Sequence, residues 1–517
     1  MLKRWFNTGG PCNPQQHYMV PVDQRLPAVR ELVARGNYFI VHAPRQIGKT
    51  TTLMALADEL TAGGQYTAAL VSLETGEAFP DDIEAAESAL LDAWRGSLMN
   101  DLPQELWPPP WPEASAGSRI KVALGEWSRV SPRPLVLFLD EIDSLRDATL
   151  ITLLRQLRDG YRARPGGFPA SLALVGLRDL ADYRVQTDAR AYLGRGSPFN
   201  VTVESLTLAE FTPDEVNGLY AQHTADTGQL FTGEALARVF FWTRGQPWLV
   251  NAIGRQLIDV LVTDRSRAIV PADVDEAAKI LIARNDTHLI SLSERLREPR
   301  VRAIVEPMIG GDTPPALPND DVRYACDLGL LRRGTDGTLE VANPIYKDVI
   351  IRDLMLSPRV VLPKMRPAWL TDDGRLDEGQ LFDAFVAFWR RHGEPMMRAA
   401  PYHEIAPHLV MMAYLDRVAN GGGTVEREYA IGSGRVDLCL RLGATVVALE
   451  LKVWREHEPD PKAEGLEQLD AYLAGLGLAT GWLVIFDRRP GLARLAERTT
   501  VEEARTPGGR TVRVIRG

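Results

Sequence analysis

The chain has 517 residues, of which 45% are hydrophobic and 25% are charged, so it has room for three or four domain cores and is neither disordered nor fibrous. The net charge is 59 − 68 = −9, which argues against a protein that coats nucleic acid through bulk positive charge. Three widely spaced cysteines, no long apolar run and no apolar signal core at the start indicate a cytoplasmic protein without a membrane partner.

Residues 1–205 alternate between strand-like and helix-like patterns. Four runs of strand length are almost entirely apolar: 38–43, 66–74, 134–141 and 170–177. Strands that are covered on both faces need this composition, and repeated strand, turn and helix patterns build a parallel sheet. The proline-rich stretch 102–113 is expected to be an extended surface loop. This part of the chain therefore predicts an α/β core.

The rest of the chain is expected to form four smaller parts. Residues 206–299 have helical patterns, several of which open with a Ser, Thr or Asp cap, and predict a helical lid. Residues 300–356 continue with helices and then an Asp-Gly turn that suits a short hairpin, as in a winged helix. A proline-rich linker at 357–376 leads to a last domain at 377–517. The expected fold class is therefore α/β multidomain.

The turn after the first strand carries a candidate phosphate-binding loop. It consists of Ala43, Pro44, Arg45, Gln46, Ile47, Gly48, Lys49 and Thr50, followed by Thr51. The pattern G-x-x-x-x-G-K-S/T uses backbone N–H groups to cradle phosphate, a lysine to reach the β and γ oxygens, and a hydroxyl to join Mg²⁺. Ala43 replaces the first glycine, which is acceptable if the backbone there avoids positive φ. We expect ATP and Mg²⁺ to bind here; the alternative is a chance G-K-T before a helix.

Two adjacent acids strengthen this interpretation. The apolar run of residues 135–139 leads directly into Asp140 and Glu141, which places both carboxylates at the carboxyl end of a buried strand, where open α/β sheets bind ligands. Asp140 and Thr50 are expected to hold Mg²⁺, and Glu141 to orient or deprotonate the attacking water. Adjacent acids at a strand end are also common capping residues, so their meaning depends on the loop upstream.

Residues 15–355 resemble the bacterial AAA-like ATPases of the archaeal-ATPase and STAND-related group. The resemblance rests on YFIVHAPRQIGKTT, LVLFLDEID, ALVGLRDLADYR, SPFNVTVESLTLAEF and TRGQPWLVNAI. It implies that residues 1–205 are a P-loop ATPase core. The segments DLGLL and NPIYKDVI match the winged-helix domain that often follows such ATPases.

The same resemblance suggests roles for three arginines. Arg178, after the fourth strand of the core, would sense the γ-phosphate. Arg190 or Arg195 would act as an arginine finger across a subunit boundary, which requires a homo-oligomer that forms with ATP. A solvated surface charge is an equal alternative for each. The Gly245-Gln246-Pro247 turn resembles the sensor region of the lid.

The last domain carries a second chemical pattern. A strand-like segment at 434–440 is followed by a turn at Gly443 and a return strand that contains Glu450 and Lys452. The strand period of two places Glu450 and Lys452 on one face, and pairing of the two segments as a hairpin would bring Asp437 beside Glu450. Two carboxylates bind a hard divalent cation, and the ammonium orients a water or stabilises the charge that develops on the phosphate.

This pattern resembles the D…E-x-K constellation of the PD-(D/E)XK nucleases. In the helix that follows, Gln468 and Tyr472 stand four residues apart and resemble the RecB-like branch. The resemblance implies that Asp437, Glu450, Lys452 and Gln468 are catalytic, with Mg²⁺, or alternatively Mn²⁺, held by the first two.

Other ligands and a structural alternative remain open. The family often supplies a fourth acid from its first helix, where Glu404 lies, and Glu426 and Glu428 are rivals. His403 and His408 are further candidates, although helix histidines are more often packed or solvated. The pattern E-x-K on an amphipathic strand is also common as an ion pair without catalysis.

Taken together, the motifs predict an ATP-dependent protein that processes nucleic acid. Mg-ATP hydrolysis would be coupled to metal-dependent phosphodiester cleavage of DNA, with a role in defence against foreign DNA by analogy only. The winged helix and Arg295, Arg297, Arg300 and Arg302 are expected to contact phosphates, a solvated helix face being the alternative. One rival is an ATP-gated binding or signalling protein whose nuclease-like domain only binds nucleic acid. The other is a structural ATPase that assembles oligomers without nucleic acid.

Overall fold

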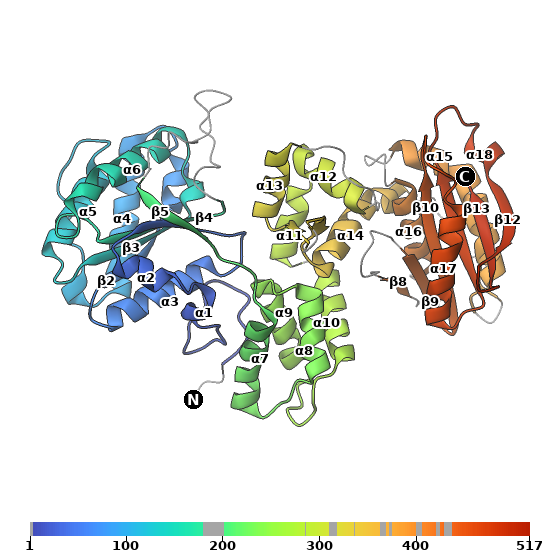
Figure 1. The fold of residues 1–517 in the computed structure, drawn as a ribbon, viewed down its shortest axis with the longest axis horizontal. Coiled ribbons are helices and arrows are strands. Elements are labelled where there is room, and N and C mark those ends of the chain that lie inside the picture. The colour runs from blue at the N-terminus through green and yellow to red at the C-terminus, as the bar shows by residue number, and fades with distance from the viewer. Residues whose placement is uncertain are drawn as a thin grey trace. The chain divides into compact units, whose positions relative to one another are not determined.

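The computed structural model describes most of the chain in two compact units (Figure 1). The described residues are 4–178, 201–284, 286–309, 318–334, 337–361, 369–371, 375–399, 406–419, 424–428 and 437–517. Unit 1 comprises Met1–Arg284 and Tyr324–Leu331, and unit 2 comprises Asn285–Arg323 and Arg332–Gly517.

Unit 1 is built on a five-stranded parallel sheet with the strand order β2-β3-β4-β1-β5. Its strands are β1 (Tyr38–His42), β2 (Thr67–Ser72), β3 (Leu135–Asp140), β4 (Ser171–Gly176) and β5 (Thr202–Thr207). The first four match the predicted runs, and the parallel α/β core is confirmed. Every residue of β3 and β4 is buried, as expected of central strands that are covered on both faces.

Alternate side chains of these strands supply two hydrophobic cores, one on each face of the sheet. The helices that follow the first strands are α1 (Val22–Arg25), α2 (Val29–Ala34), α3 (Lys49–Ala62), α4 (Ile83–Asp101), α5 (Arg119–Val130) and α6 (Asp147–Gly160). On one face Val136 and Phe138 pack with residues of α1, α2 and α3. On the other face Leu137 and Leu139 pack with α4, α5 and α6. Because the strands are parallel, their carboxyl ends lie along the same side of the sheet.

The helical lid of unit 1 consists of α7 (Pro213–Thr227), α8 (Gly233–Thr243), α9 (Pro247–Gln256) and α10 (Pro271–Arg284), with a π-helical turn at Leu257–Leu261. Its helices begin where capping residues predict. Thr212 and Glu215 form a capping box at α7, Thr232 caps α8, and Gln246 caps α9 ahead of Pro247. Helices therefore follow the sheet as expected, and the role of residues 206–299 as a lid stays a prediction.

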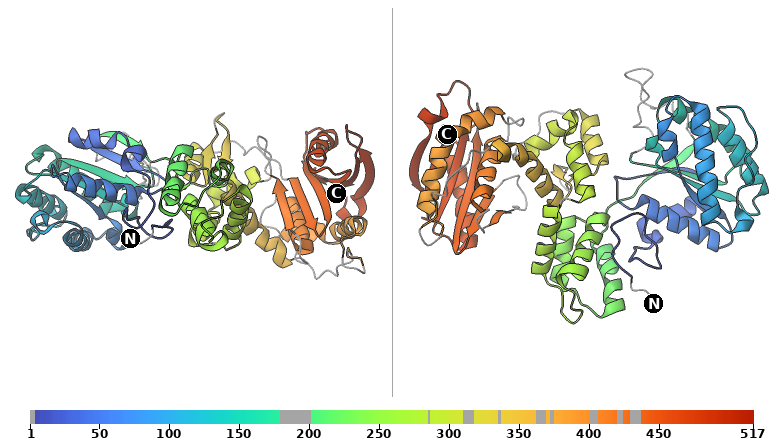
Figure 2. Two further views of the ribbon diagram at one scale, coloured as in Figure 1. Left: turned by 90° about the horizontal axis from the view of Figure 1, so that it is seen from below. Right: turned by 180° about the vertical axis from the view of Figure 1, so that it is seen from behind.

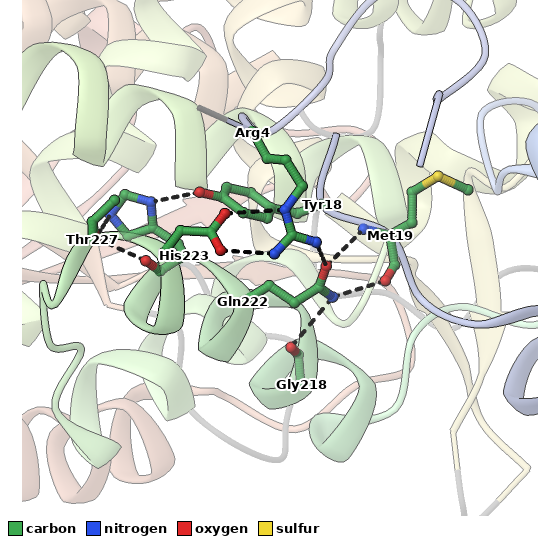
Figure 3. A network of polar contacts seen from close by, with 8 residues as sticks. Arg4, Tyr18, Met19, Gly218, Gln222, His223 and Thr227 are labelled. Carbon is green, nitrogen blue, oxygen red and sulfur yellow. Dashed lines mark hydrogen bonds and ion pairs between the residues drawn. The ribbon is translucent and has the colours of Figure 1, made fainter. Parts of the chain in front are cut away.

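The N-terminal arm, residues 4–19, contacts helix α7 of this lid through polar side chains (Figure 3). Arg4 forms an ion pair with Asp226 at 2.9 Å, and the Gln222 amide donates to the Met19 carbonyl at 2.8 Å. The Tyr18 hydroxyl lies 3.2 Å from Nδ1 of His223, whose pKa is lowered by burial. The arm therefore forms part of unit 1.

Unit 2 begins with α11 (Thr287–Arg295) and α12 (Pro299–Ile309). Helix α13 (Asn319–Asp327), a two-stranded sheet of β6 (Leu331–Arg333) and β7 (Leu339–Val341), and α14 (Pro344–Val361) follow along the chain. Residues Tyr324–Leu331 within this stretch belong to unit 1. The residues of the expected Asp336-Gly337 turn are only partly described, because residue 336 lies outside the described ranges. Helix α14 continues through residues 357–361, which differs from the linker expected to begin at 357.

The last part of unit 2 is a six-stranded mixed sheet with the order β12-β13-β11-β10-β9-β8. Its elements are α15 (Glu378–Ala399), α16 (Ala406–Ala419), β8 (Thr424–Glu428), β9 (Asp437–Leu442), β10 (Thr445–Trp454), α17 (Lys462–Leu476), β11 (Thr480–Asp487), α18 (Leu495–Arg498), β12 (Thr500–Arg505) and β13 (Thr511–Arg516). Strand β11 is parallel to both β10 and β13, and the other pairs are antiparallel.

Helices cover both faces of this sheet (Figure 2). On one face Leu469 and Leu473 of α17 pack with Leu483 and Ile485 of β11. On the other face aromatic side chains of α15 contact the alternate residues of β11, as in the Phe382–Trp482 pair. Among the described residues, none of the helices has both the length and the hydrophobicity that a membrane span requires.

Candidate functional site

The phosphate-binding loop joins β1 to α3, in the strand, turn and helix context that its sequence predicts. Gly48 is the N-cap of α3 and has φ 93°, a conformation that favours glycine. Gln46 also has a positive φ of 61°. Ala43 does not belong to the positive-φ residues and is buried, with its N–H donating to the Gly176 carbonyl at 3.2 Å. Alanine therefore replaces the usual glycine without backbone strain.

Lys49 is folded back onto its own loop. Its Nζ donates hydrogen bonds to the carbonyls of Ala43 at 2.7 Å and Pro44 at 2.9 Å. Burial lowers the pKa of Lys49 to about 8, against the attraction of Asp140. A phosphate group would add negative charge beside this partly buried ammonium and favour its charged form.

The loop and the strand-end acids are joined directly. Thr50 Oγ1 donates to Asp140 Oδ2 at 2.6 Å, and the Glu141 N–H donates to Asp140 Oδ1 at 2.9 Å. Asp140 is buried, and this burial raises its pKa while the Thr50 hydrogen bond opposes the shift. The hydroxyl and the carboxylate that a nucleotide-bound Mg²⁺ would share are thus already adjacent, so these residues fit the metal.

Two neighbours of these acids were missed by the sequence analysis. Ser72, the last residue of β2, donates from Oγ to Glu141 Oε2 at 3.0 Å. Asp143 accepts the Leu177 N–H at 2.9 Å and so ties the loop after β3 to the end of β4. A single serine at a strand end carries no sequence signal, whereas the register of β2 and β3 pairs Ser72 with Asp140.

Arg178 follows β4 at the same edge of the sheet, and its guanidinium carbon lies 5.4 Å from the ring centroid of Tyr324. Its place in the fold agrees with the prediction, and its sensor role stays a prediction. Arg190 and Arg195 lie outside the described residues. Arg45 is exposed, and Thr51 Oγ1 accepts the Cys12 N–H at 3.1 Å.

In the last domain, β9 and β10 form the predicted hairpin. The register pairs Leu438 with Leu449 and continues to Leu442 with Thr445. The paired residues end one position before Asp437, the first residue of β9, and Glu450. The side chain of Asp437 lies outside the described residues, so its place beside Glu450 stays a prediction.

Glu450, Lys452 and Gln468 lie together. Glu450 is fully buried, and Lys452 Nζ is 3.3 Å from its Oε1. The same ammonium donates to Gln468 Oε1 on helix α17 and lies 3.2 Å from Glu464 Oε1. Gln468 Nε2 also donates to Glu464 Oε1 at 2.6 Å. Glu464 was missed by the sequence analysis because it lies outside the D…E-x-K and Q-x-x-x-Y patterns.

The remaining ligand candidates are less well placed or undescribed. Glu404 and His403 lie outside the described residues, as do the side chains of Glu426 and Glu428 within β8. His408 of α16 is buried against Phe486, and this burial lowers its pKa to about 4. Among the described side chains, no group of three or more His, Cys, Asp or Glu residues is close enough to hold a metal ion.

The geometry of unit 1 defines a class of protein. A parallel sheet whose first strand leads into a Gly-Lys-Thr loop, with that threonine bonded to an acid at the end of β3, is the arrangement of P-loop nucleotide-binding folds. Unit 1 is therefore a P-loop α/β domain.

No family model and no curated protein matches this chain. Among solved structures it is similar to a Walker-type ATPase of Pyrococcus abyssi, with 12% identity over 67% of this chain and 99% of that chain and a TM-score of 0.46. It is also similar to the RuvB Holliday junction branch migration motor of Thermotoga maritima, with 17% identity, 63% and 92% coverage and a TM-score of 0.35. It is similar as well to the ORC2 protein of Aeropyrum pernix, with 15% identity over 64% of this chain and 91% of that chain and a TM-score of 0.36.

Proposed function

We propose that unit 1 binds and hydrolyses Mg-ATP. The observation that carries this proposal is the contact of Thr50 with Asp140 beside the partly buried Lys49. Lys49 would leave the loop carbonyls for the β and γ oxygens, and Thr50 and Asp140 would hold Mg²⁺, which neutralises charge on the phosphates when bound. Glu141 would take the proton of the water that attacks the γ-phosphorus, and the bond to the ADP oxygen would break.

We further propose that the last domain is a PD-(D/E)XK nuclease domain that cleaves phosphodiesters with Mg²⁺ or Mn²⁺. The support is that Lys452 contacts Glu450 on the same strand and Gln468 on the following helix α17, while Asp437 begins the paired strand β9. Asp437 and Glu450 would hold the metal, which would stabilise charge on the phosphate when bound. The Lys452 ammonium would orient water or stabilise the developing negative charge.

DNA is the proposed substrate, with a cytoplasmic role in defence against foreign DNA by analogy alone. Residues 300–356 would serve as a winged helix, and Arg190 or Arg195 as a finger in an ATP-dependent homo-oligomer. The phosphate-contact arginines are less favoured than the sequence suggested, because Arg295 and Arg300 pair with Glu298 and Arg302 pairs with Glu306. Such pairs must be broken or shared before a phosphate is bound.

One observation favours a second candidate function for the last domain. The Lys452 ammonium is held by Glu450, Glu464 and Gln468 at once, which is also the environment of a structural ion pair. The chain would then be an ATP-gated binding protein whose nuclease-like domain holds nucleic acid without cutting it.

A single experiment tests both proposals on the full chain: plasmid DNA is incubated with protein, Mg²⁺ and ATP, and phosphate release and nicking are followed together. Lys49→Ala should abolish nucleotide binding, whereas Glu141→Gln should retain binding and stop turnover. Normal hydrolysis by Lys49→Ala would overturn the ATPase proposal. Retarded but uncut DNA with either metal would favour the binding protein.

A further inference from the structure

Two buried side chains outside the phosphate-binding loop donate hydrogen bonds to backbone carbonyls of the loop. Gln246, the N-cap of lid helix α9, donates from Nε2 to the Gln46 carbonyl at 3.4 Å. Arg25 of α1 donates from Nη2 to the Ile47 carbonyl at 3.3 Å. Both donors are less than 10% exposed, so these contacts are sheltered from competing water.

The direction of a carbonyl decides the direction of the next N–H group. In a trans peptide the C=O bond and the N–H bond of the next residue lie in one plane and point in opposite directions. A Gln46 carbonyl held outward therefore turns the Ile47 N–H inward, and an Ile47 carbonyl held outward does the same for Gly48. Inward N–H groups of successive loop residues are the donors that cradle a phosphate. Arg25 and Gln246 thus fix the two peptide planes that phosphate binding needs.

The same two side chains are anchored in the lid. Arg25 also donates to the Ala209 carbonyl at 2.6 Å, lies 3.5 Å from Glu215 of α7, and sits over the ring of Phe211. Gln246 accepts the Leu249 N–H at 2.6 Å and so caps α9. A shift of the lid would therefore pull on the loop carbonyls.

We propose that Arg25 and Gln246 are positioning residues of the phosphate-binding loop, through which the lid helices α7 and α9 set its affinity for nucleotide. This inference rests on the proposed ATP site and adds a regulatory link to it. Both residues contact backbone carbonyls of the loop, so their loss would weaken binding through the loop while leaving the chemistry of Lys49 and Glu141 intact.

Gln246→Asp separates the two roles of Gln246. Aspartate is a good N-cap and retains the bond to Leu249, but it is one methylene shorter and has no donor for the Gln46 carbonyl. We expect the Kd for a fluorescent ADP analogue and the KM for Mg-ATP to rise about three- to tenfold, the range that one lost hydrogen bond gives. The kcat should stay within about twofold, and the melting temperature should match the parent. Arg25→Lys should weaken binding similarly, because lysine lacks the fork that reaches two carbonyls.

Thr232→Ala is the matched control, because it removes the cap of lid helix α8 without contact to the loop. It should lower the melting temperature and leave the Kd unchanged. Parent-like affinity of Gln246→Asp would overturn the inference, as would an equal loss of affinity in Thr232→Ala. If the parent itself bound no nucleotide, the proposed ATPase function would fall first, and the two failures are therefore distinguishable.

Discussion

Ser72 Oγ donates a 3.0 Å hydrogen bond to Glu141 Oε2 across the ends of the neighbouring strands β2 and β3. Glu141 has a left-handed backbone with φ 60° and ψ 43°, and burial raises its pKa. One oxygen of the proposed water-activating carboxylate therefore accepts a hydrogen bond from Ser72. Activation of a water through Oε2 would require that this hydrogen bond be broken or shared.

Ser72→Ala is expected to raise the basal rate of ATP hydrolysis. A hydrogen bond to a charged group is worth about 1.5–3 kcal/mol, and the lower value suits this exposed pair, which corresponds to roughly tenfold in rate if Glu141 must release Ser72 first. Steady-state phosphate release at saturating ATP measures the change. Nucleotide affinity should remain that of the parent, because Ser72 does not contact the phosphate-binding loop.

Ser144→Ala provides a control in the same region. Ser144 Oγ donates to the Leu73 carbonyl at 2.9 Å and does not touch Glu141, so its loss should affect stability but not rate. A slower Ser72→Ala enzyme would contradict the inhibitory reading and would make Ser72 a group that orients Glu141 for catalysis.

Nucleotide affinity is expected to depend on pH through Lys49. Its pKa in the nucleotide-free loop is about 8, lowered by burial, so the ammonium loses its proton as the pH rises through that value. Phosphate oxygens favour the charged form, and binding above pH 8 must therefore take up a proton. The affinity should fall by up to about tenfold per pH unit above pH 8 and be flat below it.

Titration of a fluorescent nucleotide between pH 7 and 9.5 measures this dependence. Lys49→Arg is the control, because its guanidinium stays charged throughout the range, so any residual affinity should not fall above pH 8. Equal slopes for the parent and Lys49→Arg would assign the effect to another group.

Substitution of two lid glycines by alanine is expected to lower the free energy of unfolding by very different amounts. Gly245 and Gly228 both have positive φ, of 81° and 77°. A Cβ on Gly245 would lie 1.9 Å from the Phe211 carbonyl oxygen, whereas one on Gly228 would meet open space. Gly228→Ala should cost about 1–2 kcal/mol from backbone strain alone. Gly245→Ala should cost at least about 3 kcal/mol, because overpacking adds to that strain. Urea unfolding of both variants, followed by lid tryptophan fluorescence, tests the difference; equal costs would contradict the close packing.

The sequence predicted the sheet of unit 1 where its strands are buried. Strands β1 to β4 fall within two residues of the expected runs, because central parallel strands are marked by continuous apolar residues. Edge strand β5 was missed, because Glu204 and Ser205 are exposed and interrupt that signal.

The candidate sites were predictable only where motif residues are close in sequence or follow strand periodicity. The loop around Lys49 and the pairing of Glu450 with Lys452 belong to this group. Ser72 and Glu464 were not predictable, because their roles arise from strand register and from packing of α17 on β10. The turn that contains Gln246 was noted in the sequence, but its contact with the Gln46 carbonyl was not predicted. Such contacts leave no local pattern in a single sequence.

The nuclease proposal can be tested most directly by substitution of Lys452. Lys452→Arg keeps the positive charge that a structural pair with Glu450 and Glu464 requires, but it replaces a compact ammonium by a planar guanidinium. We expect it to reduce Mg²⁺- or Mn²⁺-dependent cleavage of plasmid DNA by at least about 100-fold, because the group acts on charge that develops in the transition state. Glu450→Gln, which removes a proposed metal ligand, should act similarly. Both should retain the ATPase rate, since Lys49 and Lys452 belong to different units.

Glu467→Gln is the matched control on the same helix α17. Glu467 is exposed one residue before Gln468, so its change should leave cleavage, ATP hydrolysis and melting temperature unaltered. Glu464→Gln removes the carboxylate shared by Lys452 and Gln468 while keeping an acceptor, and it should reduce cleavage only severalfold if it positions the ammonium. If Lys452→Arg cleaved DNA like the parent, the cluster would be a structural ion pair, and the last domain would serve to bind nucleic acid.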